Sequence, residues 1–88
     1  ANIIVIDVFG NCSTNLRVAQ VKDLAKTTLK IGGQTVEGIV PSYGHRKPGD
    51  LVAVTDSEGF VEIAVVNGSA AGKFGIQLDD PVEVIFHD

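Results

Sequence analysis

Hydrophobic residues in this chain occur in short runs that are rich in β-branched side chains and are separated by glycine, proline, asparagine and aspartate. Runs of this length, several with alternating polar and apolar positions, are typical of β-strands. The expected strands are residues 2–8, 27–31, 34–40, 51–55, 60–66 and 82–86. The pattern predicts an all-β domain, a small antiparallel β-barrel or sandwich of six to seven short strands with one or two short helices. We expect the two terminal strands to lie near each other.

The segments between the expected strands carry the residues that turns and loops favour. Gly32 and Gly33 predict a tight hairpin, and residues 56–59 predict a turn between two strands. Residues 9–15 are expected to form a turn or loop, and residues 41–50 form the longest irregular stretch.

Two segments are compatible with short helices. Residues 18–24 are expected to form one or two helical turns. Residues 70–74 are expected to form a short helix, capped by Asn67 or Ser69 at its start and ended by Gly75.

The composition is that of a folded globular domain. Of 88 residues, 44% are hydrophobic and 20% are charged, so we expect one domain with a single modest core. The net charge of −4 argues against a nucleic-acid partner. The single cysteine, Cys12, excludes an internal disulfide and argues against a metal site. No apolar run is long enough to span a membrane and no signal-peptide pattern is visible, so a cytoplasmic setting is the simplest expectation.

Side chains suited to catalysis are scarce. His45 lies in the breaker-rich stretch, where exposure is expected, and His87 lies beside the C-terminus, where mobility is expected. Cys12 has no histidine near it in sequence, so a buried thiol is expected rather than a nucleophile. Glu62 sits inside an apolar strand and faces away from its two neighbours, as on the wet face of a sheet. We therefore expect no catalytic residue in this chain.

Side chains that bind a planar ligand are better represented. Phe9 and Asn11 directly follow an expected strand, where a rigid sheet can present a ring and an amide. Aromatic rings stack on purines, and asparagine amides match the donor and acceptor edge of adenine, so Asn11 and Asn15 form a candidate pair. Tyr43 is expected to be partly exposed, whereas Phe60 opens a strand and is better explained as core. A simple turn of glycine and asparagine explains the first segment equally well.

Three motifs extend this interpretation. Residues 6–15 read IDVFGNCSTN, residues 57–71 contain SEGFVEIA followed by NGSAA, and residues 75–84 read GIQLDDPVEV. In order and spacing these segments resemble the C-terminal domain of the S-adenosylmethionine (SAM) hydroxide adenosyltransferases, which are relatives of the SAM-dependent fluorinase and chlorinase. The resemblance covers essentially the whole chain.

The resemblance implies an enzyme that converts SAM to adenosine and methionine with water or hydroxide, with SAM as its substrate and no cofactor. Members are homotrimers in which an N-terminal α/β domain carries the catalytic residues. A C-terminal β-barrel covers the adenine, and each site lies between the N-terminal domain of one subunit and the C-terminal domain of its neighbour. Residues 1–88 correspond to the C-terminal domain alone. Because the chain begins at Ala1 and has no methionine, we expect a fragment of a two-domain enzyme that is inactive alone.

The resemblance also implies binding residues. Asn11 corresponds to the asparagine that hydrogen-bonds adenine, Phe9 to the aromatic residue beside it, and Tyr43 to an aromatic residue against the adenine ring. Ser57 corresponds to a serine that meets the methionine carboxylate, and backbone groups of residues 65–67 reach the adenine edge. The implied ligand-binding residues are Phe9, Asn11, Tyr43, Ser57, Val65 and Asn67.

Two positions depart from the halogenases of this group. Glu58 and Val65 stand where the halogenases carry arginines, which favours hydroxide over halide as the nucleophile. The Glu58 position also leaves the recognition of the amino-acid end of SAM open.

Two other classes of function stay open. One is a non-catalytic β-barrel module that binds an adenine-containing ligand or a peptide edge, and the other is a domain that assembles oligomers. Convergence of Asn11, Tyr43 and Ser57 on one face favours the enzyme domain, whereas a contiguous apolar outer patch without them favours assembly.

Overall fold

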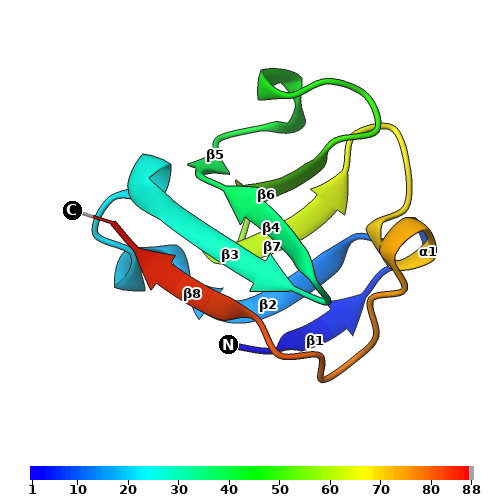
Figure 1. The fold of residues 1–88 in the computed structure, drawn as a ribbon, viewed down its shortest axis with the longest axis horizontal. Helices are drawn as coiled ribbons and strands as arrows, with labels where there is room; N and C mark the ends of the chain where they lie inside the picture. Colours follow the sequence, from blue (N-terminus) through cyan, green and yellow to red (C-terminus); the bar gives the residue numbers. More distant parts are fainter. Residues whose placement is uncertain (88) are drawn as a thin grey trace.

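Eight strands in two sheets make up the part of the chain that the computed structural model describes, which is residues 1–87 without the side chain of His45 (Figure 1). The expected exposure of His45 therefore lies outside the described residues. The same residues contain one α-helix, α1 (Ala70–Phe74), and three short 3₁₀ helices: Val18–Gln20, Leu24–Lys26 and Tyr43–His45. The all-β prediction is confirmed.

The larger sheet has the strand order β1-β2-β7-β6-β5, and the smaller sheet has the order β4-β3-β8. The strands of the larger sheet are β1 (Ile3–Ile6), β2 (Cys12–Arg17), β5 (Ile39–Val40), β6 (Leu51–Thr55) and β7 (Phe60–Val65). Those of the smaller sheet are β3 (Thr27–Ile31), β4 (Gln34–Glu37) and β8 (Glu83–Phe86). Neighbouring strands are antiparallel except β5 and β6, which are parallel. The two sheets do not join into a closed barrel, so the fold is the sandwich form of the prediction.

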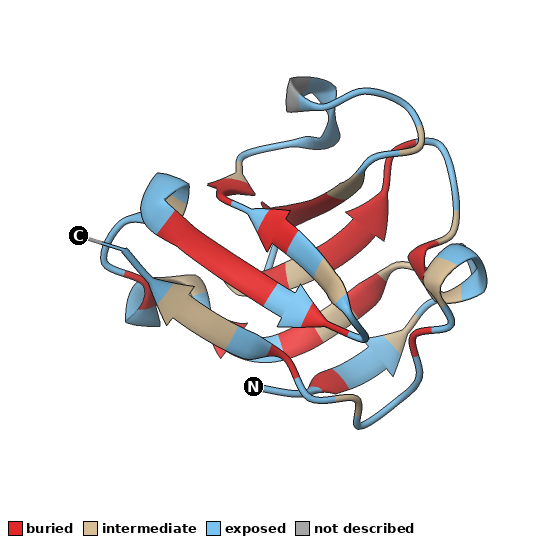
Figure 2. Cartoon of the chain, viewed as in Figure 1, coloured by how far each residue is buried: buried red, intermediate tan, exposed pale blue. Residues whose placement is uncertain are grey.

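One main hydrophobic core takes residues from both sheets. Leu29 and Ile31 of β3 are almost fully buried in it, as are Val61 and Ile63 of β7. Alternate residues of each strand face this core, as the pleat requires. Figure 2 shows the long buried segments on β3, β6 and β7.

A second, smaller cluster covers the outer face of the larger sheet. It consists of Val52, Val54, Ala64 and Val66, with Val40 packed against them. Val52 and Val54 alternate along β6 with residues that face the main core, so they point to the opposite side. The larger sheet is therefore apolar on both faces around β6 and β7.

The turn between β6 and β7 is built around one aspartate. Asp56 Oδ1 accepts the N–H groups of Glu58 (2.8 Å) and Phe60 (2.9 Å). Gly59 takes a positive φ of 85°, which glycine adopts without strain. The predicted turn at this place is confirmed, and the same construction recurs between β1 and β2 at residues 7–11.

The prediction of a loop over residues 9–15 is wrong from Cys12 onward, where β2 begins. Cys12, Thr14 and Leu16 are buried and alternate with more exposed neighbours. Because Cys12 and Thr14 are not strongly apolar, the sequence did not show the alternation of apolar and polar residues that predicts a strand. The Thr14 hydroxyl donates to the Val61 carbonyl at 2.7 Å, which allows a polar side chain inside the core.

Three other expectations are corrected in detail. The strand expected at residues 34–40 is divided into β4 and β5 by Gly38, which has a φ of 80° and donates its N–H to the Thr27 carbonyl at 2.8 Å. With β2, this division raises the strand number from the expected six or seven to eight. Residues 2–8 contribute only the shorter β1. The helical turns expected within residues 18–24 are a 3₁₀ helix at Val18–Gln20, and a second 3₁₀ helix, Leu24–Lys26, overlaps that range only at Leu24.

The start of β1 lies beside the segment that leads into β8, as predicted for the terminal strands (Figure 1). The Val82 N–H donates to the Ala1 carbonyl at 2.7 Å, although β1 and β8 belong to different sheets. His87 is held rather than mobile. Its backbone N–H donates to the Lys26 carbonyl (2.9 Å), and its ring Nε2 lies 2.8 Å from the Thr28 hydroxyl.

Candidate functional site

A surface hollow of about 510 Å³ lies where the β1–β2 turn, the β5–β6 connection and the segment after β7 meet. Its lining residues are Phe9, Asn11, Tyr43, Val65, Asn67, Gly68 and Ser69. Five of the six residues implied by the family resemblance are therefore neighbours around one hollow, although they come from three separate segments. Ser57 is the sixth, and it lies elsewhere.

The β1–β2 turn forms the first wall, and Asp7 organises it. The Asp7 Oδ1 atom accepts the N–H groups of Phe9 (2.9 Å) and Asn11 (3.0 Å). The Asn11 side-chain nitrogen donates to Asp7 Oδ2 at 3.3 Å. Because its nitrogen is engaged in this way, Asn11 has its Oδ1 available as an acceptor for a ligand. Phe9 is 73% exposed, so its ring is presented to whatever lies outside the turn.

Gly10 fastens this turn to the segment that precedes α1. A Cβ at Gly10 would lie 1.8 Å from Ser69 Oγ, and the φ of Gly10 is +81°. The Ala71 N–H also donates to the Gly10 carbonyl at 3.0 Å. Of the two predicted caps, Asn67 and Ser69, Ser69 is the N-cap of α1, and its Oγ accepts the Gly72 N–H at 2.9 Å. Only glycine permits this close approach, which places Asn11 beside Asn67.

The segment after β7 forms the second wall. Asn67 has a positive φ of 57°, a conformation that asparagine tolerates better than most residues. The Gly68 N–H donates to the Val65 carbonyl at 3.0 Å, which tightens the turn that follows the strand. Gly68 and Ser69 also line the hollow and were not predicted to do so. Their position directly after Asn67 in the NGSAA motif could have indicated that they line the same hollow.

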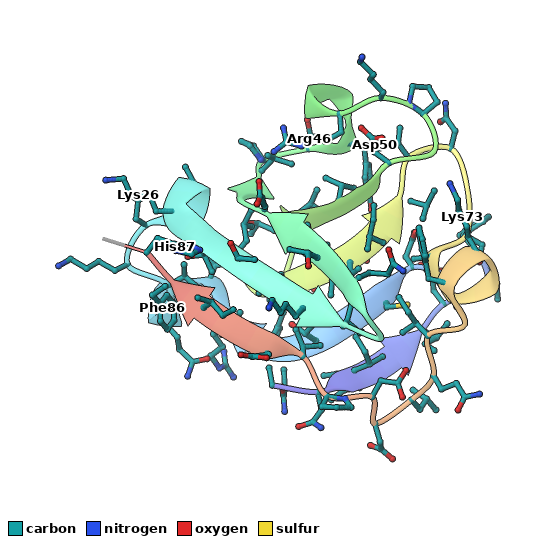
Figure 3. The ribbon with its side chains drawn as sticks, viewed as in Figure 1. Lys26, Arg46, Asp50, Lys73, Phe86 and His87 are labelled. Carbon is teal, nitrogen blue, oxygen red and sulfur yellow. The ribbon has the colours of Figure 1, made fainter. Side chains whose placement is uncertain are left out.

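The loop of residues 41–50 supplies the third wall through Tyr43. This residue opens a 3₁₀ helix and is 39% exposed, in agreement with the predicted partial exposure. The Tyr43 hydroxyl donates to Glu62 Oε2 on β7. At the far end of the loop, Lys73 of α1 donates to the Gly49 carbonyl at 2.9 Å (Figure 3).

Ser57 lies in a neighbouring groove of about 360 Å³ on the outer side of the larger sheet. The groove is lined by Ile4, Val5, Ser13, Thr14, Asp56, Ser57, Glu58, Phe60 and Glu62. Asn15 also lies outside the hollow, and its Oδ1 accepts the Asn2 N–H at 2.8 Å. The structure therefore separates Asn15 from Asn11, and the suggested pairing of their amides on one base is wrong.

The electrostatic setting of the hollow is weakly negative. None of the seven lining residues carries a charge, but the carboxylates of Asp7 and Glu62 contact Asn11 and Tyr43. Burial, the hydrogen bond to Glu62 and the charges of Glu62 and Asp7 raise the pKa of Tyr43 to about 12. Burial and nearby carboxylates also raise the pKa of Cys12 to about 11. Cys12 is fully buried, so the expected inert thiol is confirmed in position.

Comparison with known proteins gives the family. Residues 1–83 match the family described as the SAM hydroxide adenosyltransferase C-terminal domain. The chain belongs to this family. Two of the three motifs identified in the sequence contribute to the hollow: the first through Phe9 and Asn11, and the second through Asn67, Gly68 and Ser69.

Two solved structures share the fold of this C-terminal domain. An uncharacterized conserved protein from Thermotoga maritima is 26% identical, with a TM-score of 0.78, and the match covers 96% of this chain and 35% of that protein. A conserved hypothetical protein from Thermus thermophilus is 28% identical, with a TM-score of 0.82, and the match covers 96% of this chain and 34% of that protein. The chain thus spans about a third of their length. No curated protein matches the sequence.

The described residues contain neither a membrane-spanning helix nor a metal-ligand cluster. None of their helices has the length and apolar character needed to cross a membrane. No group of three or more histidine, cysteine, aspartate or glutamate side chains is placed to hold a metal ion in this part of the chain.

Proposed function

We propose that this chain is the adenine-covering domain of a SAM hydrolase, which converts SAM and water to adenosine and methionine. The water oxygen bonds to C5′ while the C5′–sulfur bond breaks, its electron pair leaves with methionine, and the water loses a proton. The observation that carries the proposal is the convergence of Phe9, Asn11 and Tyr43 on one hollow. Family membership supplies the reaction class.

Each wall of the hollow has a role in this proposal. Adenine lies against the rings of Phe9 and Tyr43, because a purine and an aromatic ring stack favourably. Asn11 Oδ1 accepts a hydrogen bond from the exocyclic amino group, because Asp7 engages the Asn11 nitrogen. Backbone groups of Val65 and Asn67 reach the remaining polar edge of the base.

The charges around the hollow support SAM or adenosine over a nucleotide. An uncharged lining with Asp7 and Glu62 behind it suits a neutral base joined to a cationic sulfonium. The same carboxylates repel the phosphates of a nucleotide. Discrimination against nucleotides therefore uses the two carboxylates that already position Asn11 and Tyr43.

Ser57 receives the methionine carboxylate in this proposal. Its groove also contains Asp56, Glu58 and Glu62, which are unfavourable neighbours for a second carboxylate. A cationic group from another domain is therefore needed to complete the amino-acid end of the site. The N-terminal α/β domain of the same or a neighbouring subunit is the proposed source, and it also carries the catalytic residues.

Exposed apolar side chains near the hollow support such a partner domain. Ile4 and Val5 are 47% and 51% exposed, and Val8 and Phe9 are 93% and 73% exposed. Apolar groups gathered on β1 and the turn that follows it are typical of a surface that another protein element covers. We propose that the adjoining subunit of a homotrimer covers it.

The test is adenosine formation from SAM by a full-length protein in which this domain follows its catalytic domain. Substitution Asn11→Ala is expected to raise KM for SAM by about three- to tenfold, the effect of losing one hydrogen bond to the base. Asn15→Ala is the matched control, because it removes the same amide outside the hollow. Absence of adenosine formation by the unsubstituted full-length protein would refute the proposed function.

A further inference from the structure

The loop of residues 41–50 contributes Tyr43 to the lining of the hollow. The other lining residues belong to the β1–β2 turn, or to the end of β7 and the segment that follows it, and those two walls are joined through Gly10 and Ser69. The position of the third wall therefore depends on what holds residues 41–50 against the sheet.

The far end of this loop is attached by backbone hydrogen bonds. The Gly49 N–H donates to the Val66 carbonyl at 2.8 Å, and the Val66 N–H donates to the Asp50 carbonyl at 3.0 Å. Figure 3 labels Asp50 at this end of the loop. At the other end, the hydroxyl of Tyr43 reaches the sheet by donating to Glu62 Oε2.

Glu62 is a charged residue among apolar neighbours on β7, and no strand pairing requires its carboxylate. It lies between buried Val61 and Ile63 on β7, and it faces the outer side of the sheet, opposite Val54 of β6. The next outward residue on β7 is Ala64, which is fully buried in the small apolar cluster. The contact that gives the Glu62 carboxylate a role is therefore the hydrogen bond it accepts from Tyr43.

Glu62 also stands between the two concave sites. It lines the groove that contains Ser57, while its partner Tyr43 lines the hollow. The hydrogen bond between them thus runs along the boundary between the hollow and the groove.

We propose that Glu62 is a positioning residue that fixes the Tyr43 ring in the wall of the hollow and thereby sets the affinity for a planar base. The link to base binding rests on the proposed function, whereas the link between Glu62 and Tyr43 does not. The raised pKa of Tyr43 agrees with this arrangement, because a neutral phenol is the state that can donate to a carboxylate.

The composition of the chain makes the contact directly measurable. Tyr43 is the single tyrosine and the chain has no tryptophan, so phenol absorbance reports on this residue alone. With Glu62→Ala, the titration of Tyr43 is expected to move down from about 12 toward its ordinary value of 10.0. Ring signals of Tyr43 in NMR spectra at neutral pH are expected to move toward those of a mobile tyrosine. Glu83→Ala, on β8 of the other sheet, is the control for loss of a strand carboxylate and should change neither.

Adenosine affinity, measured by NMR titration of this chain, gives the second readout. Glu62→Ala and Tyr43→Phe are each expected to weaken adenosine binding by about three- to tenfold, and the double variant no further, because both changes remove one interaction. Glu62→Gln is expected to restore most of the affinity, since its amide oxygen still accepts the phenol hydrogen. A purely structural role for Glu62 does not predict this rescue.

The outcomes separate the two proposals. A folded Glu62→Ala variant with an unchanged Tyr43 titration and unchanged ring signals would overturn the positioning role. Additive losses in the double variant would overturn it as well. Failure of the full-length protein to form adenosine, with the Tyr43 titration shifted as expected, would refute the hydrolase function and leave Glu62 as the residue that positions Tyr43.

Discussion

The two aspartate-built turns of the larger sheet share one local structure and differ in what surrounds them. In each turn the aspartate N–H donates to a carbonyl four residues later, Asp7 to Asn11 at 3.0 Å and Asp56 to Phe60 at 2.8 Å. In each, the fourth residue is a glycine with a φ above 80°. At the second turn a Cβ on Gly59 would meet no atom within 4 Å, whereas at the first Gly10 lies against Ser69.

This difference separates what local sequence determines from what packing determines. The pattern of aspartate, two residues and glycine is sufficient to form the hairpin turn at both places. Only the first turn is packed against the N-terminus of α1, and only that turn lines the hollow. The first turn therefore owes its place in the wall of the hollow to its packing against Ser69, which the turn sequence does not encode.

Alanine at the two glycines tests this comparison with the largest expected effect. Gly59→Ala is expected to lower the free energy of unfolding by about 1–2 kcal/mol, the cost of a left-handed alanine. Gly10→Ala carries the same cost and a clash with Ser69, which adds about 1–3 kcal/mol. Urea denaturation followed by circular dichroism measures both changes. Equal losses at the two positions would show that the close approach to Ser69 does not matter.

Alanine at the two aspartates separates stability from binding. Asp7→Ala and Asp56→Ala each remove an acceptor of two backbone N–H groups, so each is expected to cost about 1–2 kcal/mol in unfolding free energy. Only Asp7→Ala is expected to weaken adenosine binding as well, because Asp7 also orients the Asn11 amide. Calorimetric unfolding and an adenosine titration on the same samples provide the two values. The comparison fails if Asp56→Ala weakens adenosine binding to the same degree.

The residue after each turn gives an effect that is confined to alkaline pH and is absent at neutral pH. Cys12 and Val61 occupy equivalent positions and both are fully buried. The pKa of the Cys12 thiol rises from 9.0 to about 11 on folding, so between these values the folded chain binds more protons than the unfolded chain. Stability is therefore constant with respect to this thiol below pH 9 and falls as pH rises toward 11. Urea midpoints across pH 8–11 measure it, and a Cys12→Val variant, which resembles the second turn, is expected to show a weaker decline. An identical decline in that variant would contradict the assignment to Cys12.

Much of the fold could be predicted from the sequence where apolar alternation was strong. β3, β6 and the helix Ala70–Phe74 were predicted with their observed bounds. The signals were polar and apolar alternation for β3, a continuous apolar run for β6, and capping residues with a terminal glycine for the helix. β2 was missed because Cys12 and Thr14 carry the inward positions, although the first turn has the same pattern of aspartate and glycine as the correctly predicted second turn.

The residues that line the candidate site were easier to predict than the contacts that hold them together. Most of the residues were found from the family motifs, and Tyr43 from the wider family resemblance, yet the contacts that join them link segments that are far apart in the sequence. Ser69 meets Gly10, and Glu62 meets Tyr43, with no local pattern linking either pair. Such pairs depend on how separate segments pack, and the sequence of one segment does not contain that information.

The contact between Gly10 and Ser69 also has a consequence for the entropy of ligand binding. Because the first turn and the start of α1 are joined, two of the three walls of the hollow are already in place before a ligand arrives. Ordering them on binding then costs little conformational entropy. If the proposed function holds, the entropic cost falls mainly on residues 41–50, so stiffening that loop at positions other than Tyr43 is the most direct way to change the affinity for a base.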